Sequence, residues 1–337
     1  MSNPLRIGVL GCAAIARPFI RDVAASPLVR VVAVASRSAD KAAAFAAETG
    51  VARHHGSYEA LLADREVDAI YLPLPNSLHA EWAMAAARAG KHVLCEKPLA
   101  VSRAEALTMF EAARAHHVWL MEAFMYRFHP RTQKLAELLA QRAIGQVRLI
   151  RASFGFFLSA PNDVRLNADL VGGALMDVGC YCVNLARMVA GDAPTHASAA
   201  AVWAASGVDE TLAGTLTFPG GVLAQIACTL AGSFHQQIQI IGSDGSIDID
   251  GAFNLPADQP GHMRIRYGAR AERTEELTFA PVDQYQLEAE ALSQLVQAGH
   301  GATKLPEMPL AETLDNMATI EALLRSARTG QSVEIAP

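Results

Sequence analysis

The first hundred residues alternate between short apolar runs and helical patterns, and this alternation constrains the fold more than any other feature of the chain. Four apolar runs read as buried strands, at residues 5–11, 29–36, 67–75 and 92–98. Helical patterns lie between them, at residues 13–26, 38–50 and 79–91. Ser38 is expected to cap the second helix and Gly50 to end it. Strands that alternate with helices of this length form a parallel sheet covered on both faces, so the sequence predicts a doubly wound α/β domain over residues 1–122.

From about residue 147 the pattern changes to strands joined by short turns. These strands are expected at residues 146–157, 197–204, 210–218, 221–230 and 235–250, and the last contains the hairpin turn GSDG. A helix at 174–191 interrupts them, and another at 309–330 closes the chain. Strands separated by tight turns favour antiparallel pairing. Residues 123–337 are therefore predicted to form an α+β domain with a mostly antiparallel sheet.

Composition and charge exclude several classes of protein. The 337 residues are 51% hydrophobic and carry a net charge of −6, which disfavours a nucleic-acid partner. No run approaches the ~18 apolar residues of a membrane span, and the start of the chain lacks the basic and apolar regions of a secretory signal. The five cysteines show no metal-binding spacing, so neither a disulfide framework nor a metal site is expected. A cytoplasmic protein is the expectation.

The stretch RIGVLGCAAIARPF (6–19) resembles the turn that holds a dinucleotide between a strand and a helix. The usual fingerprint is G-x-G-x-x-G or G-x-G-x-x-A. Gly11 stands at the first glycine position, where the chain turns most sharply, and Ala13 and Ala16 take the other two. Alanine at the last place still permits helix–strand packing, whereas the methyl group of Ala13 is expected to move the pyrophosphate slightly outward. We interpret the stretch as a working cofactor loop.

The end of the second strand predicts which dinucleotide binds. An NAD-specific site usually offers Asp or Glu here, but this strand runs into Ser36 and Arg37, and Lys41 follows one turn into the helix. A 2′-phosphate carries roughly two negative charges, which a hydroxyl, a guanidinium and an ammonium would bind. NADP(H) is therefore the expected cofactor. The alternative is that Ser36 only caps the helix and Arg37 is a solvated surface charge.

Two further motifs carry side chains suited to proton transfer. Lys97 directly follows the fourth strand and precedes Pro98, so it lies at the carboxyl edge of the sheet, and a cis Lys97–Pro98 bond would fix its direction. Near a cationic nicotinamide the pKa of Lys97 would fall. Asp177 and Tyr181 are four residues apart at a helix start and share one face, with Arg165 nearby in the sequence. A tyrosine beside a lysine suits alcohol–carbonyl interconversion, although each of these residues also has a common structural role.

The glycines of VGGALMD, just before Asp177, predict a close approach of the backbone to a neighbouring group. The cofactor is expected at the carboxyl ends of the parallel strands, where ligands gather in such sheets. His79, in PLPNSLHAEW, is the histidine expected to face it. The predicted cofactor-binding residues at this edge are Gly11, Ala13, Ala14, Ile15, Ser36, Arg37, Lys41, Leu74, Asn76, His79, Glu96, Lys97 and Pro98.

These motifs together resemble the glucose–fructose oxidoreductase / inositol dehydrogenase (Gfo/Idh/MocA) family. The resemblance is carried by GVLGCAAIA, LPNSLHAEWAMAAARAGKHVLCEKPLA, EAFMYRFHP, GGALMDVGCYCVNLAR and MATIEALLRSARTGQSVEI, which together span nearly the whole chain. It implies a Rossmann domain followed by a domain with a large open sheet, which often serves in dimerisation. It also implies that the closing helix at 309–330 packs back toward the first domain. A homodimer or homotetramer formed through this sheet is therefore expected.

The resemblance also implies roles for individual residues. Lys97 matches the lysine that contacts substrate and cofactor, and Asp177 matches a substrate-binding or orienting aspartate. Glu122 and Arg127, in EAFMYRFHP, are expected to line the nicotinamide end of the cofactor site. Tyr181 stands where many relatives carry a catalytic histidine, which is similar to the branch of glucose–fructose oxidoreductase, NADP-linked xylose dehydrogenase and dimeric dihydrodiol dehydrogenase. The expected substrate-binding residues are Lys97, Arg165, Asp177 and Tyr181.

The expected function is NADP-dependent oxidoreduction of an aldose or a similar cyclic polyol. Tyr181, aided by Lys97, would take the hydroxyl proton as hydride leaves C1 for the nicotinamide, and a lactone would result. A variant of this reaction keeps NADP bound and passes the hydride to a second sugar. A trans-dihydrodiol dehydrogenase and a reductase of anhydrofructose-type ketones are the alternatives. A non-catalytic NADP-sensing regulator is disfavoured because both proton-transfer residues are present.

Overall fold

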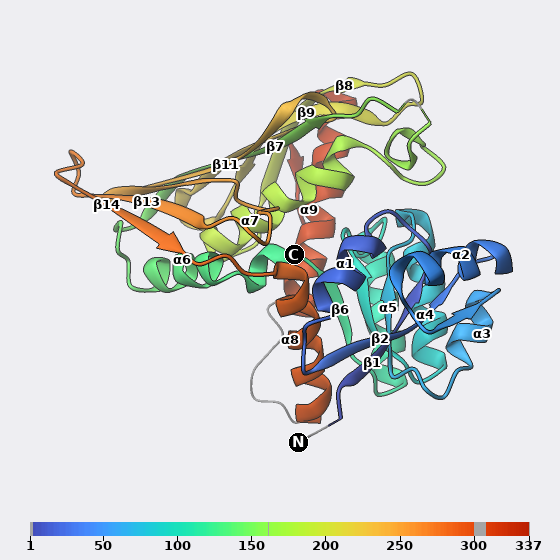
Figure 1. Cartoon of the computed structure of the whole chain (residues 1–337). Coiled ribbons are helices and arrows are strands. Elements are labelled where there is room, and N and C mark those ends of the chain that lie inside the picture. The colour runs from blue at the N-terminus through green and yellow to red at the C-terminus, as the bar shows by residue number, and fades with distance from the viewer. Residues whose placement is uncertain (1–2, 161, 300–307, 337) are drawn as a thin grey trace. The chain divides into compact units, whose positions relative to one another are not determined.

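The chain folds into two compact units, each built on its own sheet (Figure 1). A computed structural model describes residues 3–160, 162–299 and 308–336. Unit 1 consists of Met1–Phe128 and Asp283–Leu310, and unit 2 consists of His129–Val282 and Ala311–Pro337.

Helix α8 (Gln284–Ala298) belongs to unit 1, although it follows strands of unit 2 in the sequence. Leu292 on this helix is completely buried in the core of unit 1. The neighbouring Ser293 hydroxyl donates a 2.9 Å hydrogen bond to the Leu28 carbonyl. The sequence predicts one domain over all of 123–337, so the placement of α8 in unit 1 is a correction. Nothing in the helix itself indicates the surface on which it packs.

Unit 1 is built on a six-stranded parallel sheet. Its strands are β1 (Leu5–Leu10), β2 (Val29–Ala35), β3 (Arg53–His55), β4 (Ala69–Leu72), β5 (His92–Glu96) and β6 (Leu120–Ala123). Their order, β3-β2-β1-β4-β5-β6, is that of a doubly wound dinucleotide-binding sheet, so the fold predicted for this part is confirmed. β3 and β6 were not predicted, because strands of three and four residues leave little periodic pattern.

Further helices of unit 1 are α1 (Ala16–Val23), α2 (Ala39–Thr49), α3 (Tyr58–Leu62), α4 (His79–Arg88) and α5 (Arg103–Ala115). The Ser38 hydroxyl accepts a hydrogen bond from the Lys41 backbone N–H, and Gly50 has a φ of +71°, so the predicted cap and the predicted stop of α2 are confirmed. α1 begins later than the sequence predicted. This leaves residues 11–15 as an open turn at the carboxyl end of β1.

The core of unit 1 gathers side chains from the sheet and from helices α1 and α8. Val9, Phe19 and Leu94 are completely buried there. The rings of Phe19 and Tyr71 stack with their centroids 3.8 Å apart. Burial of each such side chain contributes roughly 1.5–3 kcal/mol. This packing fixes β1, β4 and β5, whose carboxyl ends carry much of the predicted site.

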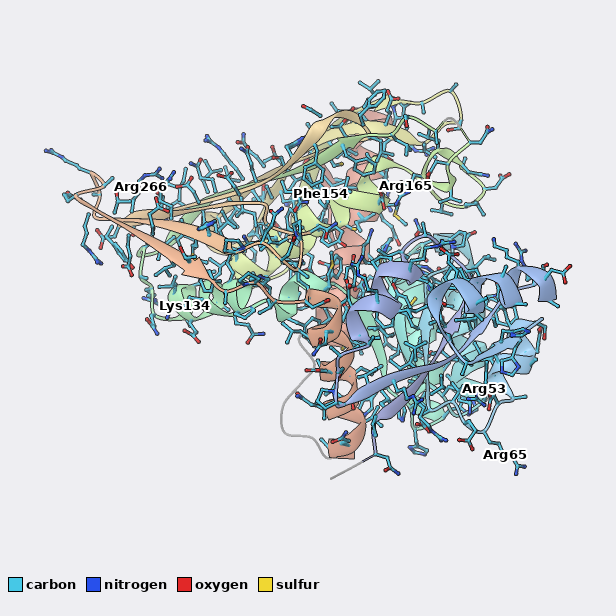
Figure 2. All side chains as sticks on the ribbon, in the orientation of Figure 1. Arg53, Arg65, Lys134, Phe154, Arg165 and Arg266 are labelled. Carbon is cyan, nitrogen blue, oxygen red and sulfur yellow. The ribbon has the colours of Figure 1, made fainter. Side chains whose placement is uncertain are left out.

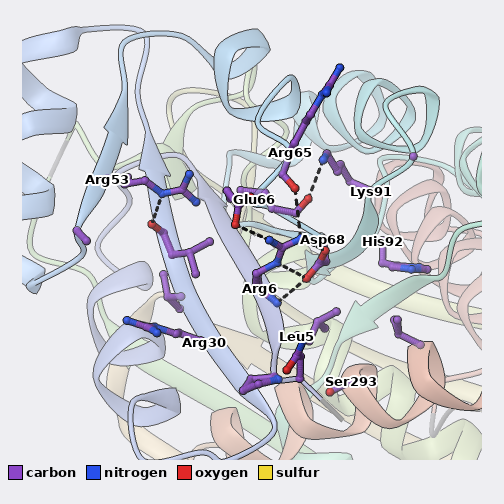
Figure 3. A pocket seen from close by; sticks show the side chains of 18 of the residues that line it. Leu5, Arg6, Arg30, Arg53, Arg65, Glu66, Asp68, Lys91, His92 and Ser293 are labelled. Atoms are coloured by element: carbon purple, nitrogen blue, oxygen red, sulfur yellow. Dashed lines mark hydrogen bonds and ion pairs between the residues drawn. The ribbon is translucent and has the colours of Figure 1, made fainter.

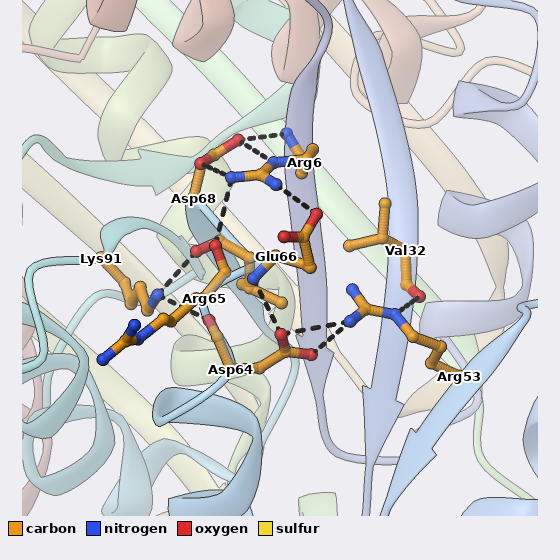
Figure 4. Close-up of polar contacts among 9 residues, drawn as sticks. Arg6, Val32, Arg53, Asp64, Arg65, Glu66, Asp68 and Lys91 are labelled. Carbon is orange, nitrogen blue, oxygen red and sulfur yellow. Dashed lines mark hydrogen bonds and ion pairs between the residues drawn. The ribbon is translucent and has the colours of Figure 1, made fainter.

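Polar side chains at the opposite, amino-terminal edge of this sheet pair with one another (Figure 4). Arg6 forms a bidentate pair with Asp68, with Nε 2.9 Å from Oδ2 and Nη2 2.7 Å from Oδ1. The Lys91 ammonium donates to the carbonyls of Asp64 and Val67. Arg6, Asp68 and Lys91 line a pocket of about 1250 Å³ at that edge (Figure 3). Because cofactors of doubly wound sheets bind at the carboxyl ends of the strands, this pocket is not the candidate cofactor site.

Unit 2 is built on a nine-stranded sheet in the order β14-β13-β12-β11-β7-β10-β9-β8-β15. Its strands are β7 (Val147–Phe157), β8 (His196–Trp203), β9 (Asp209–Thr217), β10 (Leu223–Thr229), β11 (Ala231–Gly242), β12 (Gly245–Asp250), β13 (Gly261–Tyr267), β14 (Arg273–Phe279) and β15 (Val333–Glu334). Neighbouring strands run antiparallel except β7 and β10, so the predicted, mostly antiparallel sheet is confirmed. Gly242 pairs with Gly245 across a two-residue turn, which confirms the predicted hairpin.

Helices of unit 2 lie on one side of its sheet in Figure 1, and no described helix is drawn against the other side. They are α6 (Pro130–Ala140), the π-helix η4 (Leu175–Gly179), α7 (Cys180–Ala190) and α9 (Leu310–Thr329). α9 confirms the closing helix, whereas its packing toward the first domain stays a prediction. Of the helices that the structure describes, none is both long and apolar enough to span a membrane.

Candidate active site

The turn after β1 is shaped by Gly11. Gly11 has a φ of +124°, and a Cβ atom there would lie 2.7 Å from Cδ2 of Leu74, so this position requires glycine. Ala13, Ala14 and Ile15 continue the turn and are at least partly exposed. Ile15 stands at the N-cap of α1 and makes no side-chain cap hydrogen bond. The first N–H groups of α1 already have partners, because Ala16 and Arg17 donate to the carbonyls of the turn at 3.2 and 3.3 Å and Pro18 has no N–H. Binding of the pyrophosphate at this turn stays a prediction.

The end of β2 carries a hydroxyl and two cations. Ser36 is buried, and its Oγ accepts a 3.3 Å hydrogen bond from the Ser38 backbone N–H. Arg37 and Lys41 are exposed. Burial raises the pKa of the Cys12 thiol and the charge of Lys41 opposes this rise, so Lys41 lies within electrostatic range of the turn after β1. These side chains fit the 2′-phosphate of NADP, whose charge two cations would neutralise.

His79, the first residue of α4, contacts both the loop after β4 and the loop after β5. Its ring is completely buried, with Nε2 2.8 Å from the Leu74 carbonyl and Nδ1 2.9 Å from the Pro98 carbonyl. Burial lowers the pKa of His79, so at neutral pH the ring is uncharged and donates to one of these carbonyls. Asn76 opens the short helix η1 (Asn76–Leu78) of the same loop. Direct contact of His79 or Asn76 with the cofactor stays a prediction.

Lys97 lies directly after β5, and its peptide bond to Pro98 is cis, an isomer that the sequence allowed but did not require. The Lys97 backbone N–H donates to Oε2 of Glu96 over 3.3 Å. Glu122, on β6, is buried and accepts a 2.9 Å hydrogen bond from the Leu99 backbone N–H. Carboxylates therefore hold the backbone on both sides of Lys97.

All the predicted cofactor-binding residues belong to unit 1. Arg127, the last of them in the chain, is buried in the short helix η2 (Met125–Phe128) that follows β6. The others come from the ends of β5 and β6, from the turns after β1, β2, β4 and β5, and from the first turns of α2 and α4. Because these strands are parallel, their carboxyl ends meet at one edge of the sheet. The structure therefore brings the predicted cofactor set together.

Asp177 and Arg165 form an ion pair within unit 2, where Figure 2 labels Arg165. Arg165 Nε donates to Oδ2 of Asp177 over 2.7 Å, and its Nη1 contacts Oδ1 of Asp163 at 3.2 Å. Although burial disfavours its charged form, the two carboxylates raise the pKa of Arg165 above its usual value. The structure thus brings two predicted substrate-binding residues together as a fixed pair of donors and acceptors.

Tyr181 follows Asp177 by four residues and lies at the start of α7. Its ring packs against Phe154 of β7 and Phe253, with centroid distances of 5.5 and 5.4 Å (Figure 2 labels Phe154). Phe154 also meets Phe234 of β11 edge-on, with centroids 6.5 Å apart. Phe234 is 67% exposed, so this aromatic cluster reaches the surface of unit 2.

Two residues that hold the site escaped the sequence analysis. The Tyr71 hydroxyl donates a 2.6 Å hydrogen bond to Glu96, and Oδ2 of Asp209 accepts a 2.7 Å hydrogen bond from the Leu175 backbone N–H. Tyr71 could have been noticed because its hydroxyl is the only polar side-chain group in an otherwise apolar strand. The signal for Asp209 was the glycine pair of VGGALMD, which predicts a close approach but does not name the partner.

Two family models match the chain. The model of the oxidoreductase family with an NAD-binding Rossmann fold matches residues 5–124. The model of the GFO/IDH/MocA C-terminal domain matches residues 132–248. The first match covers the sheet of unit 1, and the second covers much of the sheet of unit 2.

Characterised relatives resemble nearly the whole chain. D-xylose 1-dehydrogenase (NADP(+)) 2 of Haloferax volcanii is 38% identical over 332 residues, which are 98% of this chain and 100% of the relative. A 3-ketoreductase of Actinomadura kijaniata, solved with NADP and TDP-benzene, is 33% identical with a TM-score of 0.88 and covers 96% of this chain and 98% of its own. Aldose–aldose oxidoreductase of Caulobacter crescentus, solved with glycerol, is 28% identical with a TM-score of 0.88, over 98% and 99%. NADP is named for the xylose dehydrogenase and is bound in the solved 3-ketoreductase, which agrees with the cofactor predicted from the sequence.

Proposed function

The chain belongs to the GFO/IDH/MocA family of oxidoreductases, and from this premise we propose that it is an NADP-dependent sugar dehydrogenase acting at C1 of an aldose. The observation that carries the proposal is the similarity, over 98% of the chain, to an NADP-dependent D-xylose 1-dehydrogenase. The basic end of β2 supports NADP as the cofactor.

The proposed mechanism assigns a role to residues of both units. NADP held by the predicted residues of unit 1 would supply the nicotinamide that takes up the hydride from C1. Tyr181 takes the proton of the C1 hydroxyl, and Lys97 assists this transfer. The Arg165–Asp177 pair binds other hydroxyl groups of the sugar, because its donors and acceptors are already fixed. The product is a lactone.

A second form of the same reaction keeps NADP bound and returns the hydride to another sugar. The likeness to the aldose–aldose oxidoreductase favours it. Gel filtration of the purified protein separates the two forms. NADP that stays with the protein, without release of NADPH when a single aldose is added, identifies the hydride-recycling form, whereas free NADPH identifies the dehydrogenase.

A second candidate function is the reduction of a keto group on a nucleotide-linked sugar. The observation that favours it is the likeness to the 3-ketoreductase solved with TDP-benzene. This reaction uses the same proton-transfer residues in the opposite direction, with Tyr181 as the proton donor. The two candidates therefore differ in the substrate and in the direction of hydride transfer.

A substrate panel read by NADPH absorbance tests both candidates. It contains aldoses, cyclic polyols and a trans-dihydrodiol with NADP, and anhydrofructose-type ketones and a dTDP-linked ketosugar with NADPH. The first proposal expects the fastest turnover with a free aldose and a lactone as product. Fastest turnover with the dTDP-linked ketosugar would establish the second candidate in its place. No turnover with either class would overturn both.

The open face of the unit 2 sheet is the surface through which we propose that copies of the chain associate. Short and polar side chains such as Ser153 and Thr215 line a shallow hollow of about 920 Å³ on it. Arg151 is held flat on this face by bonds to Gln225 and Gln239, at 3.2 and 3.0 Å. Light scattering is expected to give the mass of two or four chains, and the mass of a single chain would overturn this proposal.

A further inference from the structure

Asp209 lies at the start of β9 and is 2% exposed. Its Oδ2 accepts a 2.7 Å hydrogen bond from the Leu175 backbone N–H. A Cβ atom on Gly173 would lie 2.2 Å from Oδ1 of Asp209, and Gly173 has a φ of +113°. Only glycine at this position lets the carboxylate reach the backbone so closely. This contact is the close approach that the glycine pair predicted.

The segment held by Asp209 is the π-helix η4, which carries Asp177 and runs directly into Tyr181. π-helical turns are rare and occur often at functional sites. The Leu175 N–H lies at the first turn of this helix, where the backbone N–H groups need partners from outside the helix. The carboxylate of Asp209, bonded to the Leu175 N–H, fixes the residue at which the helix begins. It therefore also fixes the backbone conformation of the residues that follow.

We propose that Asp209 is a positioning residue, which through Leu175 fixes the winding of η4 and the direction in which Asp177 and Tyr181 are presented. The inference rests on the proposed function, in which Tyr181 transfers the proton. Asp209 itself is not expected to touch the substrate, because it is buried behind the helix.

The ionised carboxylate holds the Leu175 N–H more firmly than the neutral acid does, because charge-assisted hydrogen bonds are the stronger ones. Burial raises the pKa of Asp209 to about 6, while the Leu175 N–H and the charge of Arg328 on α9 oppose the rise. Cys228 of β10 also faces Asp209, and burial keeps it a thiol by raising its pKa. Positioning of Tyr181 is therefore expected to weaken as the pH falls through about 6.

Steady-state kinetics on the substrate found in the panel tests the proposal with three variants. Asp209→Asn keeps an acceptor but cannot ionise, Asp209→Ala removes the acceptor, and Gly173→Ala places a methyl group against Oδ1. Asp209→Ala and Gly173→Ala are each expected to lower kcat about tenfold, with KM for NADP little changed. Asp209→Asn is expected to hold kcat, at every pH, near the lower level that the wild type reaches below pH 6, and so to lose the acid limb. The losses should not multiply in the Asp209→Ala/Gly173→Ala double variant, because the methyl group then has no carboxylate to displace.

Asp315→Asn is the matched control. Asp315 pairs with Arg187 at 3.0 Å, so the change also removes a carboxylate that anchors helix α7, but near the end remote from Tyr181. The control is expected to leave kcat unchanged. An equal fall of kcat in Asp315→Asn and Asp209→Ala would show that any loosening of α7 has this effect, and would overturn the proposal.

A readout without substrate separates this inference from the proposed function. The six tyrosines are labelled with 3-fluorotyrosine, and Tyr181→Phe assigns one fluorine NMR signal to Tyr181. We expect this signal to shift with a midpoint near pH 6 in the wild type and not in Asp209→Asn. A signal that shows no such midpoint overturns the inference even in an active enzyme. A titrating signal in a protein that turns over no sugar upholds the inference and rejects the proposed function.

Discussion

The hydroxyl of Tyr71 donates a 2.6 Å hydrogen bond to Glu96, the residue directly before Lys97. Tyr71 is completely buried on β4, and its ring stacks on Phe19 of α1. Glu96 in turn accepts a hydrogen bond from the Lys97 backbone N–H. One carboxylate thus joins the core of unit 1 to the lysine proposed for catalysis.

Tyr71→Phe keeps the stacked ring but removes the donor to Glu96. We expect the free energy of unfolding to fall by about 1–3 kcal/mol, because a half-buried carboxylate loses the hydrogen bond from a buried hydroxyl. We also expect kcat to fall about tenfold, because Lys97 is held less firmly. Urea denaturation and steady-state kinetics measure the two effects. Tyr267→Phe, which removes a 3.1 Å bond to Glu275 in unit 2, is the control and should leave kcat unchanged; an equal effect of both variants on kcat would contradict the prediction.

Lys97→Met and Tyr181→Phe remove the two side chains proposed for proton transfer. Each is expected to slow hydride transfer by about 10²–10⁴-fold, which is the usual contribution of a positioned acid or base. NADP binding should change little in Tyr181→Phe, because the ring still packs against Phe154 and Phe253. Single-turnover NADPH formation and calorimetric NADP titration measure the two quantities. Turnover close to that of the wild type in both variants would reject these roles.

The fold of unit 1 could be predicted because it depends on features that lie within short stretches of the sequence. The turn at Gly11, the cap at Ser38 and the stop at Gly50 each follow from the conformational preferences of single residues. The parallel sheet then places the residues after each strand at one edge. The cofactor set was therefore predictable as a set, although the role of each member stays a prediction.

The contacts that escaped prediction join segments far apart in the chain. Tyr71 and Glu96 lie on different strands, and Asp209 meets Leu175 across 34 residues. Helix α8 returns to unit 1 after the whole first part of unit 2. No periodicity along the chain encodes such pairings, because they depend on which surfaces the other elements leave free.

Arg37→Ala is expected to weaken the binding of NADP far more than the binding of NAD. The exposed guanidinium after β2 is proposed to pair with the 2′-phosphate, which NAD lacks, and a charged hydrogen bond of this kind contributes about 1.5–3 kcal/mol. The dissociation constant of NAD divided by that of NADP, both measured by calorimetry, should therefore fall by roughly tenfold or more. Arg30→Ala is the control, because Arg30 is also exposed but lies at the opposite end of β2. An unchanged ratio in Arg37→Ala, or the same change in both variants, would refute the assignment.

Glu288 is a completely buried carboxyl on α8, and neither of its oxygens has a hydrogen-bond partner among the residues described. Burial raises its pKa well above the usual 4.5, and the charge of Glu96 adds to the rise. The folded state therefore keeps a proton that the unfolded chain releases, and stability falls by about 1.4 kcal/mol per pH unit between the unfolded and the folded pKa. Glu288→Gln removes this pH-dependent loss of stability. The unfolding free energy of the variant should therefore exceed that of the wild type by more at about pH 8 than at about pH 5.

Chemical denaturation at the two pH values measures this gain. Glu290→Gln is the control, because Glu290 lies on the same helix but is only half-buried and bonds to Ser26 and Gln286. It should show no gain that grows with pH. A difference between Glu288→Gln and the wild type that is the same at both pH values would mean that Glu288 is ionised in the folded protein.

Phe234 and Phe157 are almost equally exposed, at 67% and 68%, but they lie differently toward Tyr181. Phe234 meets Phe154, which packs on Tyr181, whereas Phe157 follows Phe154 by three residues on β7 and so points to the other face of the sheet. An exposed ring that Phe154 links to the proposed proton-transfer residue suits the apolar face of a pyranose, and burying part of such a ring contributes less than the roughly 1.5–3 kcal/mol of a fully buried one. Phe234→Ala is therefore expected to raise KM for the sugar by roughly three- to tenfold with little change in kcat, and Phe157→Ala to leave both unchanged. Equal changes of KM in the two variants would show that exposure alone, rather than the contact of Phe234 with the Phe154–Tyr181 cluster, accounts for the effect.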